Sequence, residues 1–116
     1  MIDLGAIAKG YIADQIKDYL TKHKVNNALI NLGDNILCVG DKMTEGYRIG
    51  ITNPQKTDES IISTKVENKS VVTSGIYQRQ MKVNHHVYHH ILNPHTGYSY
   101  DNGLASVTIV SPTSLQ

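Results

Sequence analysis

The chain has 116 residues, 40% of them hydrophobic, and a formal net charge of +1. This length suits one modest domain with its own core, and the near-neutral charge argues against binding nucleic acid or membranes through bulk charge. The single cysteine, Cys38, rules out a disulfide within the chain and lies in an apolar run typical of a buried strand. No apolar run is long enough to span a bilayer, and no signal peptide is visible.

The first predicted element is a helix from about residue 5 to about residue 23. Asp3 is a candidate N-cap, and one apolar stripe is predicted from Ala8, Ile12, Ile16, Tyr19 and Leu20. Lys9 flanks this stripe instead of lying on the polar side. A helix start offers free N–H groups and a positive dipole end, which suit phosphate. The segment therefore predicts either an anion site or an ordinary capped helix whose lysine extends to solvent.

The remainder of the chain predicts strands separated by turns, because short runs of alternating or continuous apolar residues end at Gly, Asn and Pro. The strand candidates are residues 28–32, 36–40, 47–52, 61–67, 70–75, 87–92 and 104–110, with 76–83 as a further extended segment. Ser111 and Pro112 then predict the start of a second helix. This order predicts an α+β fold over residues 1–116, a single domain with one long N-terminal helix packed on a largely antiparallel sheet.

Five of the six histidines lie between residues 85 and 95. Alternation along a strand places His89 and His90 on opposite faces, and no cysteine or carboxylate joins them, so the pattern is weak for zinc. A polar strand end is the plain alternative. A third is that one histidine acts in acid–base chemistry or polar recognition.

Two further turns carry weaker signals. Thr73, Ser74 and Gly75 place two hydroxyls before a glycine, a pattern that can line a phosphate or a cofactor edge. A bend between strands explains it equally well. Gly33 predicts a tight turn, and Asn31 beside it points either into a site or into solvent.

Taken together, these stretches resemble the ApbE family of flavin transferases, formerly called thiamine biosynthesis lipoproteins. The resemblance rests on blocks that follow one another in order and with the family's spacing. They are the Asp-Leu-Gly-x-Ile-Ala-Lys-Gly block at residues 3–10, the turn at 30–33, the strand at 47–54, the Thr-Ser-Gly-x-Tyr block at 73–77, the His-His-Ile block at 89–97 and the closing strand at 106–110.

The resemblance implies a T-fold-like enzyme that uses magnesium to split FAD at its pyrophosphate. The enzyme would attach FMN to a threonine of an acceptor protein and release AMP. Such chemistry needs positioned charge more than a protein nucleophile. The implied partners are FAD and the acceptor protein, without nucleic acid, and a homo-oligomer is left open.

The resemblance also assigns roles by position. It implies that Asp3 and Lys9 contact FAD and that the carbonyl of Ala6 binds Mg²⁺, a cation that prefers oxygen. His90 is implied as the catalytic or phosphate-contacting residue. The residues implied to line the flavin-nucleotide site beside it are Thr73, Ser74, Gly75 and Ile91.

The chain departs from the family pattern at two positions and lacks two parts of it. Asp34 stands where the family has the second glycine of its paired turn, and Asn93 stands where aspartate is usual. The family's N-terminal part and the helix bearing its main metal ligands are not found. We therefore expect a central-to-C-terminal fragment, truncated at both ends, with weak or no activity alone.

Other functions remain as alternatives. One is an FAD pyrophosphatase, a second is a non-catalytic flavin- or nucleotide-binding module, and a third is a small metal-binding domain built on the histidines. By resemblance the location is extracytoplasmic, with a lipid anchor in the cell membrane.

Overall fold

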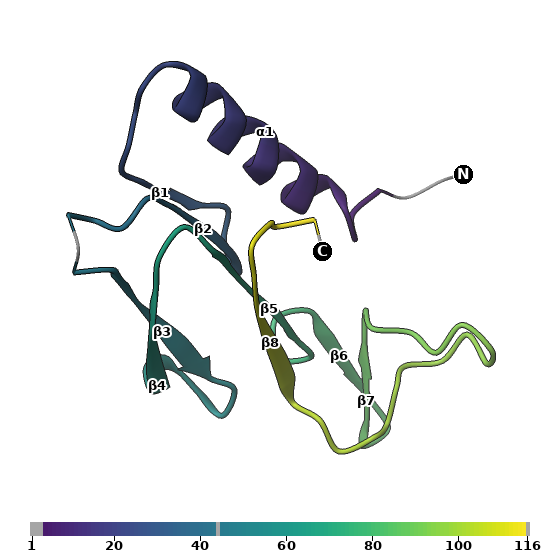
Figure 1. Cartoon of the computed structure of the whole chain (residues 1–116). Coiled ribbons are helices and arrows are strands. Elements are labelled where there is room, and N and C mark those ends of the chain that lie inside the picture. Colours follow the sequence, from purple (N-terminus) through teal and green to yellow (C-terminus); the bar gives the residue numbers. More distant parts are fainter. Residues whose placement is uncertain (1–3, 44, 116) are drawn as a thin grey trace.

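The computed structural model describes residues 4–43 and 45–115. Within these ranges one helix is followed by eight strands, arranged as Figure 1 shows. Their bounds are α1 Ala8–Lys22, β1 Ala28–Asn31, β2 Asn35–Val39, β3 Tyr47–Asn53, β4 Lys56–Val66, β5 Ser70–Gly75, β6 Gln80–Val83, β7 His86–His89 and β8 Ser106–Ser111.

The strands form one four-stranded sheet and two hairpins. The main sheet has the order β1-β2-β5-β8, and each of its pairings is antiparallel. Among the described residues, the strands of the hairpins β3-β4 and β6-β7 pair only within each hairpin. The predicted α+β class, with one N-terminal helix and antiparallel pairing, is confirmed.

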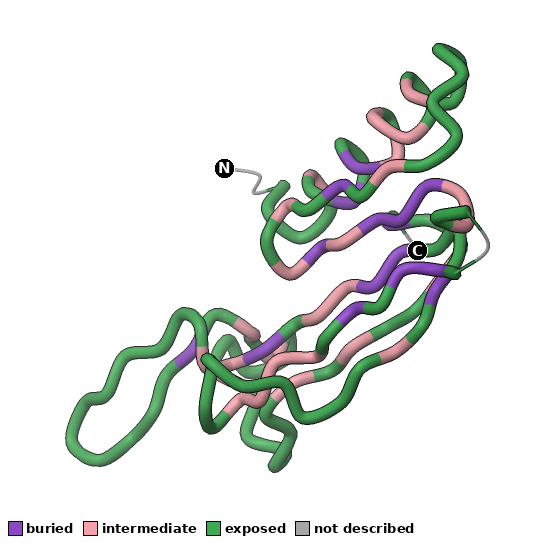
Figure 2. Tube along the Cα trace, turned by 90° about the vertical axis from the view of Figure 1, so that its left-hand side faces the viewer, coloured by how far each residue is buried: buried purple, intermediate pink, exposed green. Residues whose placement is uncertain are grey.

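Strand β2 is covered on both faces, which explains its almost continuous apolar sequence. Leu37 and Val39 face the helix and join a buried cluster with Ala13 and Ile30. Cys38 points the other way, into a second buried cluster formed with Tyr47, Ile49, Val66 and Val71. In Figure 2 the buried segments lie where the helix faces the sheet and along the neighbouring strands.

The helix starts later than the sequence predicted, and its buried face matches the predicted stripe only in part. It begins at Ala8, not near residue 5, because Leu4 to Ile7 form a turn in which the Leu4 carbonyl accepts from Ile7 and Ala8 N–H. Its buried residues are Gly10 and Ala13. Of the predicted stripe, Ile16 and Leu20 pack against the buried cluster, whereas Ile12 and Tyr19 are exposed. The described helix is neither long nor apolar enough to cross a membrane.

Close backbone approach explains the part of the buried helix face that the stripe did not predict. A Cβ at Gly10 would lie 2.5 Å from the Ser114 carbonyl oxygen, so only glycine lets α1 lie against this segment. Asp14 accepts hydrogen bonds from the N–H groups of Ser114 (2.8 Å) and Leu115 (3.0 Å). Contacts of Gly10 and Asp14 with residues about 100 positions away thus bury this side of the helix.

Two strand predictions and one helix prediction need correction. The predicted strand 87–92 ends at His89, and the extended segment 76–83 is a strand only over Gln80–Val83. No second helix starts at Ser111 within the described residues, because Ser111 continues β8 and pairs with Ser70.

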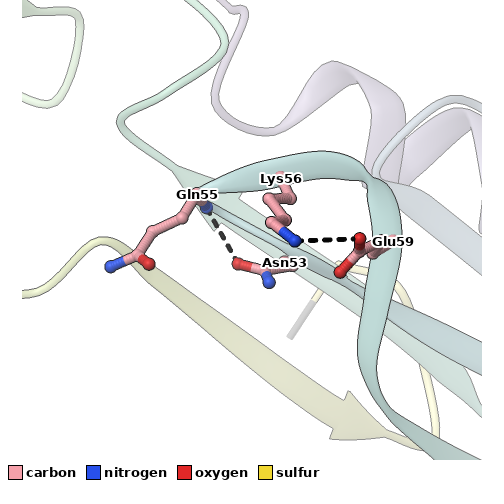
Figure 3. Close-up of polar contacts among 4 residues, drawn as sticks. All are labelled: Asn53, Gln55, Lys56 and Glu59. Carbon is pink, nitrogen blue, oxygen red and sulfur yellow. Dashed lines mark hydrogen bonds and ion pairs between the residues drawn. The ribbon is translucent and has the colours of Figure 1, made fainter.

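The β3-β4 hairpin closes through a polar turn (Figure 3). The Asn53 Oδ1 atom accepts from the Gln55 N–H at 2.9 Å, and Lys56 Nζ lies 3.2 Å from Glu59 Oε1. Both ions are largely exposed, so this pair contributes about 0–1 kcal/mol. The turn sets the register of the hairpin and carries no candidate site residue.

Candidate functional site at the turn between β1 and β2

Lys9 lies in the first turn of α1 with an exposed side chain. The residue before the helix, Ile7, provides no side-chain cap. The candidate cap and FAD contact Asp3 lies outside the described residues.

The amine of Lys9 reaches the turn between β1 and β2. Gly33 has φ +85°, and a Cβ added there would lie 3.7 Å from Lys9 Nζ. The Asn31 Oδ1 atom accepts from the Gly33 N–H at 2.9 Å, and the Leu32 N–H bonds to the Asn35 carbonyl. Asn31 therefore shapes the turn, and the cation stands beside a backbone that has no side chain to block a ligand.

Asp34 connects this turn to the Thr73–Tyr77 block. Its carbonyl accepts from the Thr73 N–H at 2.8 Å, and its carboxylate accepts from Gln78 Nε2. The Tyr77 hydroxyl is buried without a hydrogen-bond partner among the described residues. Burial, and then the charge of Asp34, raise the pKa of the Tyr77 phenol, which stays protonated at neutral pH.

The Thr73–Gly75 block is built mostly from internal contacts. The hydroxyls of Thr73 and Thr108 lie 2.8 Å apart across β5 and β8, while Ser74 is exposed. Gly75 is buried, and a Cβ there would lie 2.3 Å from the Tyr77 ring. The hydrogen bond between Thr73 and Asp34 thus places the block beside the Lys9 turn. Because Gly75 has no side chain, the Tyr77 ring can pack against it.

His90 and Ile91 follow the end of β7, in a different part of the chain. His90 is exposed, and the half-buried Ile91 accepts from the Tyr100 N–H at 3.0 Å through its carbonyl. The hydrogen bonds of the described residues do not join His90 to the Lys9 turn. The structure thus gathers Lys9 and the Thr73–Gly75 block, and places His90 and Ile91 on a separate loop.

A cavity of about 490 Å³ lies beside this loop and does not include His90. Its lining comes from β7, from Ile76 and from residues 98–105. Three histidines and three tyrosines are among its lining residues, and Asp101 is its carboxylate. It is a separate hollow from the Lys9 turn.

The described residues do not supply a metal site. Ala6 is exposed in the turn before α1, and no group of three or more His, Cys, Asp or Glu side chains gathers in the described ranges. The histidines of residues 85–95 are therefore not arranged as a zinc centre there. Any magnesium at Ala6 would need further ligands from other parts of the protein.

Sequence reasoning missed the role of Asp34 as a connecting residue and the buried state of His89. Asp34 directly follows the turn glycine, so its place in the turn could be predicted from the sequence. Its hydrogen bond with Gln78 could not, because Gln78 is 44 positions away.

A family model, that of the ApbE family, matches residues 1–116. The chain belongs to the ApbE family. Among its relatives, the FAD:protein FMN transferase of Klebsiella pneumoniae is 46% identical over 115 residues, covering 98% of this chain and 35% of the relative. The FAD:protein FMN transferase of Treponema pallidum is 38% identical, over 97% of this chain and 34% of its own length.

Solved ApbE structures agree with the fold. The ApbE protein of Thermotoga maritima superposes with a TM-score of 0.89 at 34% identity, covering 98% of this chain and 37% of that protein. The apo form of the flavinyl transferase ApbE of Pseudomonas stutzeri gives a TM-score of 0.79 at 27% identity, over 99% of this chain and 36% of its own. This ApbE-family chain therefore spans about a third of the relatives that it matches.

Proposed function

We propose that this chain is part of an FAD:protein FMN transferase. The enzyme would split the FAD pyrophosphate, attach FMN to a threonine hydroxyl of an acceptor protein and release AMP. The relatives from Klebsiella pneumoniae and Treponema pallidum, both named FAD:protein FMN transferase, support this proposal along nearly the whole chain.

The observation that carries the proposal is the position of Lys9 Nζ beside the Gly33 turn. A lysine at a helix start, facing a backbone without a side chain, suits the negative charge of a pyrophosphate. Phosphoryl transfer depends mainly on such positioned charge. In this proposal Lys9 holds the diphosphate, Asp3 contacts FAD, and Thr73, Ser74 and Gly75 border the site.

His90 is proposed to act on FAD from the loop after β7. Its exposed side chain is available to a ligand, and imidazole can exchange protons near neutral pH. Ile91, directly after it, is proposed to contact FAD. Bound FAD would have to bridge from the Lys9 turn to this loop.

In this proposal the Ala6 carbonyl is one ligand of magnesium, but the described residues do not form a complete site for it. When bound, magnesium would neutralise charge on the phosphate oxygens.

The 116-residue chain spans about a third of its relatives, so we propose that by itself it cleaves FAD weakly or not at all. The whole enzyme is proposed to work outside the cytoplasm, as a lipid-anchored membrane lipoprotein, on the family resemblance alone. A homo-oligomer is compatible with this proposal.

The test is an FAD titration of the purified chain, with and without Mg²⁺, followed by measurement of AMP release and of FMN attached to a threonine-containing peptide. The same assay on the enzyme that contains this chain is the positive control. We expect AMP release and FMN transfer from the enzyme, and little of either from the chain. AMP release without transfer would favour a pyrophosphatase, and FAD binding without AMP release by the enzyme would favour a binding module.

A further inference from the structure

His89, the last residue of β7, is 8% exposed although it directly precedes the exposed His90. The Ser99 hydroxyl satisfies both of its main-chain groups. It accepts from the His89 N–H at 2.8 Å and donates to the His89 carbonyl at 2.8 Å. One side chain thus fixes the end of β7 to a segment ten residues further along.

The ring of His89 adds a third bond to the same segment. Its Nε2 atom lies 2.9 Å from the Tyr100 carbonyl, and a carbonyl only accepts, so Nε2 carries the proton. Its Nδ1 atom is buried without a hydrogen-bond partner among the described residues. The bonds of His89 with Ser99 and Tyr100 are called the His89 clasp below.

The residues after His90 are held as well. The Ile91 carbonyl accepts from the Tyr100 N–H at 3.0 Å, and Leu92 forms a bridge with Ser99. His90 therefore has a free side chain on a backbone that is anchored on both sides. A catalytic side chain needs such support, because a misplacement of about 1 Å can cost on the order of 100-fold in rate.

We propose that His89 is a positioning residue for His90, through the His89 clasp. This inference rests on the proposed function, in which His90 acts on FAD. It assigns the two neighbouring histidines different tasks: His90 meets the ligand, and His89 fixes the backbone from which His90 extends.

The first test measures backbone order by ¹⁵N relaxation NMR on the 116-residue chain. His89→Leu removes the ring bond, His89→Gln keeps an N–H donor for the Tyr100 carbonyl, and His86→Leu is the control at an exposed position of β7. In His89→Leu we expect the order parameters of His90 and Ile91 to fall from about 0.85 to below about 0.6. His89→Gln should restore them, and unchanged values in His89→Leu would overturn the proposal.

The second test measures FAD cleavage by the enzyme that contains this chain. We expect His89→Leu to lower kcat by about 10- to 100-fold with little change in KM, and His89→Gln to recover most of it. In a His90→Ala background, His89→Leu should cause no further loss. Losses that multiply would overturn the proposal, because His89 would then act independently of His90.

The two tests separate this inference from the proposed function. If His90→Ala retains full kcat, the role proposed for His90 fails. The order parameters of the first test then decide alone whether His89 positions the loop.

Discussion

Lys9 links the start of α1 to the turn between β1 and β2. Its stem starts in the first turn of a helix, and its amine ends beside the Gly33 backbone. The one ion pair among the described residues is Lys56–Glu59, so the amine of Lys9 is not neutralised by a carboxylate there. An anionic ligand is the natural partner for it.

Replacing Lys9 by methionine keeps the stem and removes the charge. We expect Lys9→Met to weaken FAD binding about tenfold, since the lost interaction is charge-assisted but solvent-screened. Flavin fluorescence titration measures the affinity. The matched control is Lys22→Met, at the exposed other end of the same helix. Equal affinities of Lys9→Met and the unmodified chain would exclude Lys9 from the site.

At the scale of elements, Gly10 determines how closely α1 packs against the segment at Ser114. Glycine destabilises a helix by about 1 kcal/mol relative to alanine, yet at position 10 it allows the backbone of Ser114 to approach. Ser114 is itself buried, and its hydroxyl donates to Asn35 at the start of β2. The helix, the C-terminal segment and β2 therefore meet at one point.

We expect Gly10→Ala to destabilise the fold despite the better helix propensity of alanine. The added Cβ would lie 2.5 Å from a main-chain oxygen, which can move only with its segment, and such overpacking typically costs about 1–3 kcal/mol. Urea unfolding followed by circular dichroism gives the free energy. Gln15→Ala, at an exposed position of α1, is the control and should be near neutral. A more stable Gly10→Ala variant would mean that the approach of Ser114 is not tight.

The same elements explain how far the sequence could predict the molecule. Strands such as Tyr47–Asn53 were predictable because alternation along a half-buried strand is a local property. The buried face of α1 was predictable only in part. Periodicity indicated Ile16 and Leu20, but not the contacts of Gly10 and Asp14 with residues 114 and 115. Within the candidate site, Lys9 and Gly33 had local signals. The burial of His89 depends on Ser99 and Tyr100 across a loop, which no periodicity reports.

At the scale of the whole molecule, Cys38 links stability to pH. The thiol is fully buried between the main sheet and the β3-β4 hairpin, and this burial raises its pKa above 9.0. Above pH 9.0 the unfolded chain therefore loses this proton before the folded chain does. Ionisation thus favours the unfolded state, and stability falls as pH rises.

We expect the free energy of unfolding to decrease from about pH 8 to about pH 10, and this one group can contribute a slope of at most ~1.4 kcal/mol per pH unit. Cys38→Ala should lower stability at every pH, because it leaves a cavity, but should flatten the slope. Urea unfolding at several pH values measures both effects. The pKa values of Tyr47 and Tyr77 are raised above 10.0, so their contribution begins later. An identical slope in Cys38→Ala would contradict this assignment.

Because β2 is covered on both faces by buried clusters, its hydrogen bonds open less readily than those of the β6–β7 hairpin. Exchange of the β2 amides with solvent requires loss of both buried clusters, whereas the β6–β7 hairpin pairs only with itself and exposes nearly all of its residues. The hairpin can therefore open at a lower free energy than the sheet, and native-state hydrogen exchange would detect this as weak protection at Gln80–Val83 beside strong protection at Leu37. The loop bearing His90 and the turn beside Lys9 thus belong to units of different stability, so the two halves of the proposed site can separate and rejoin while the rest of the chain stays folded.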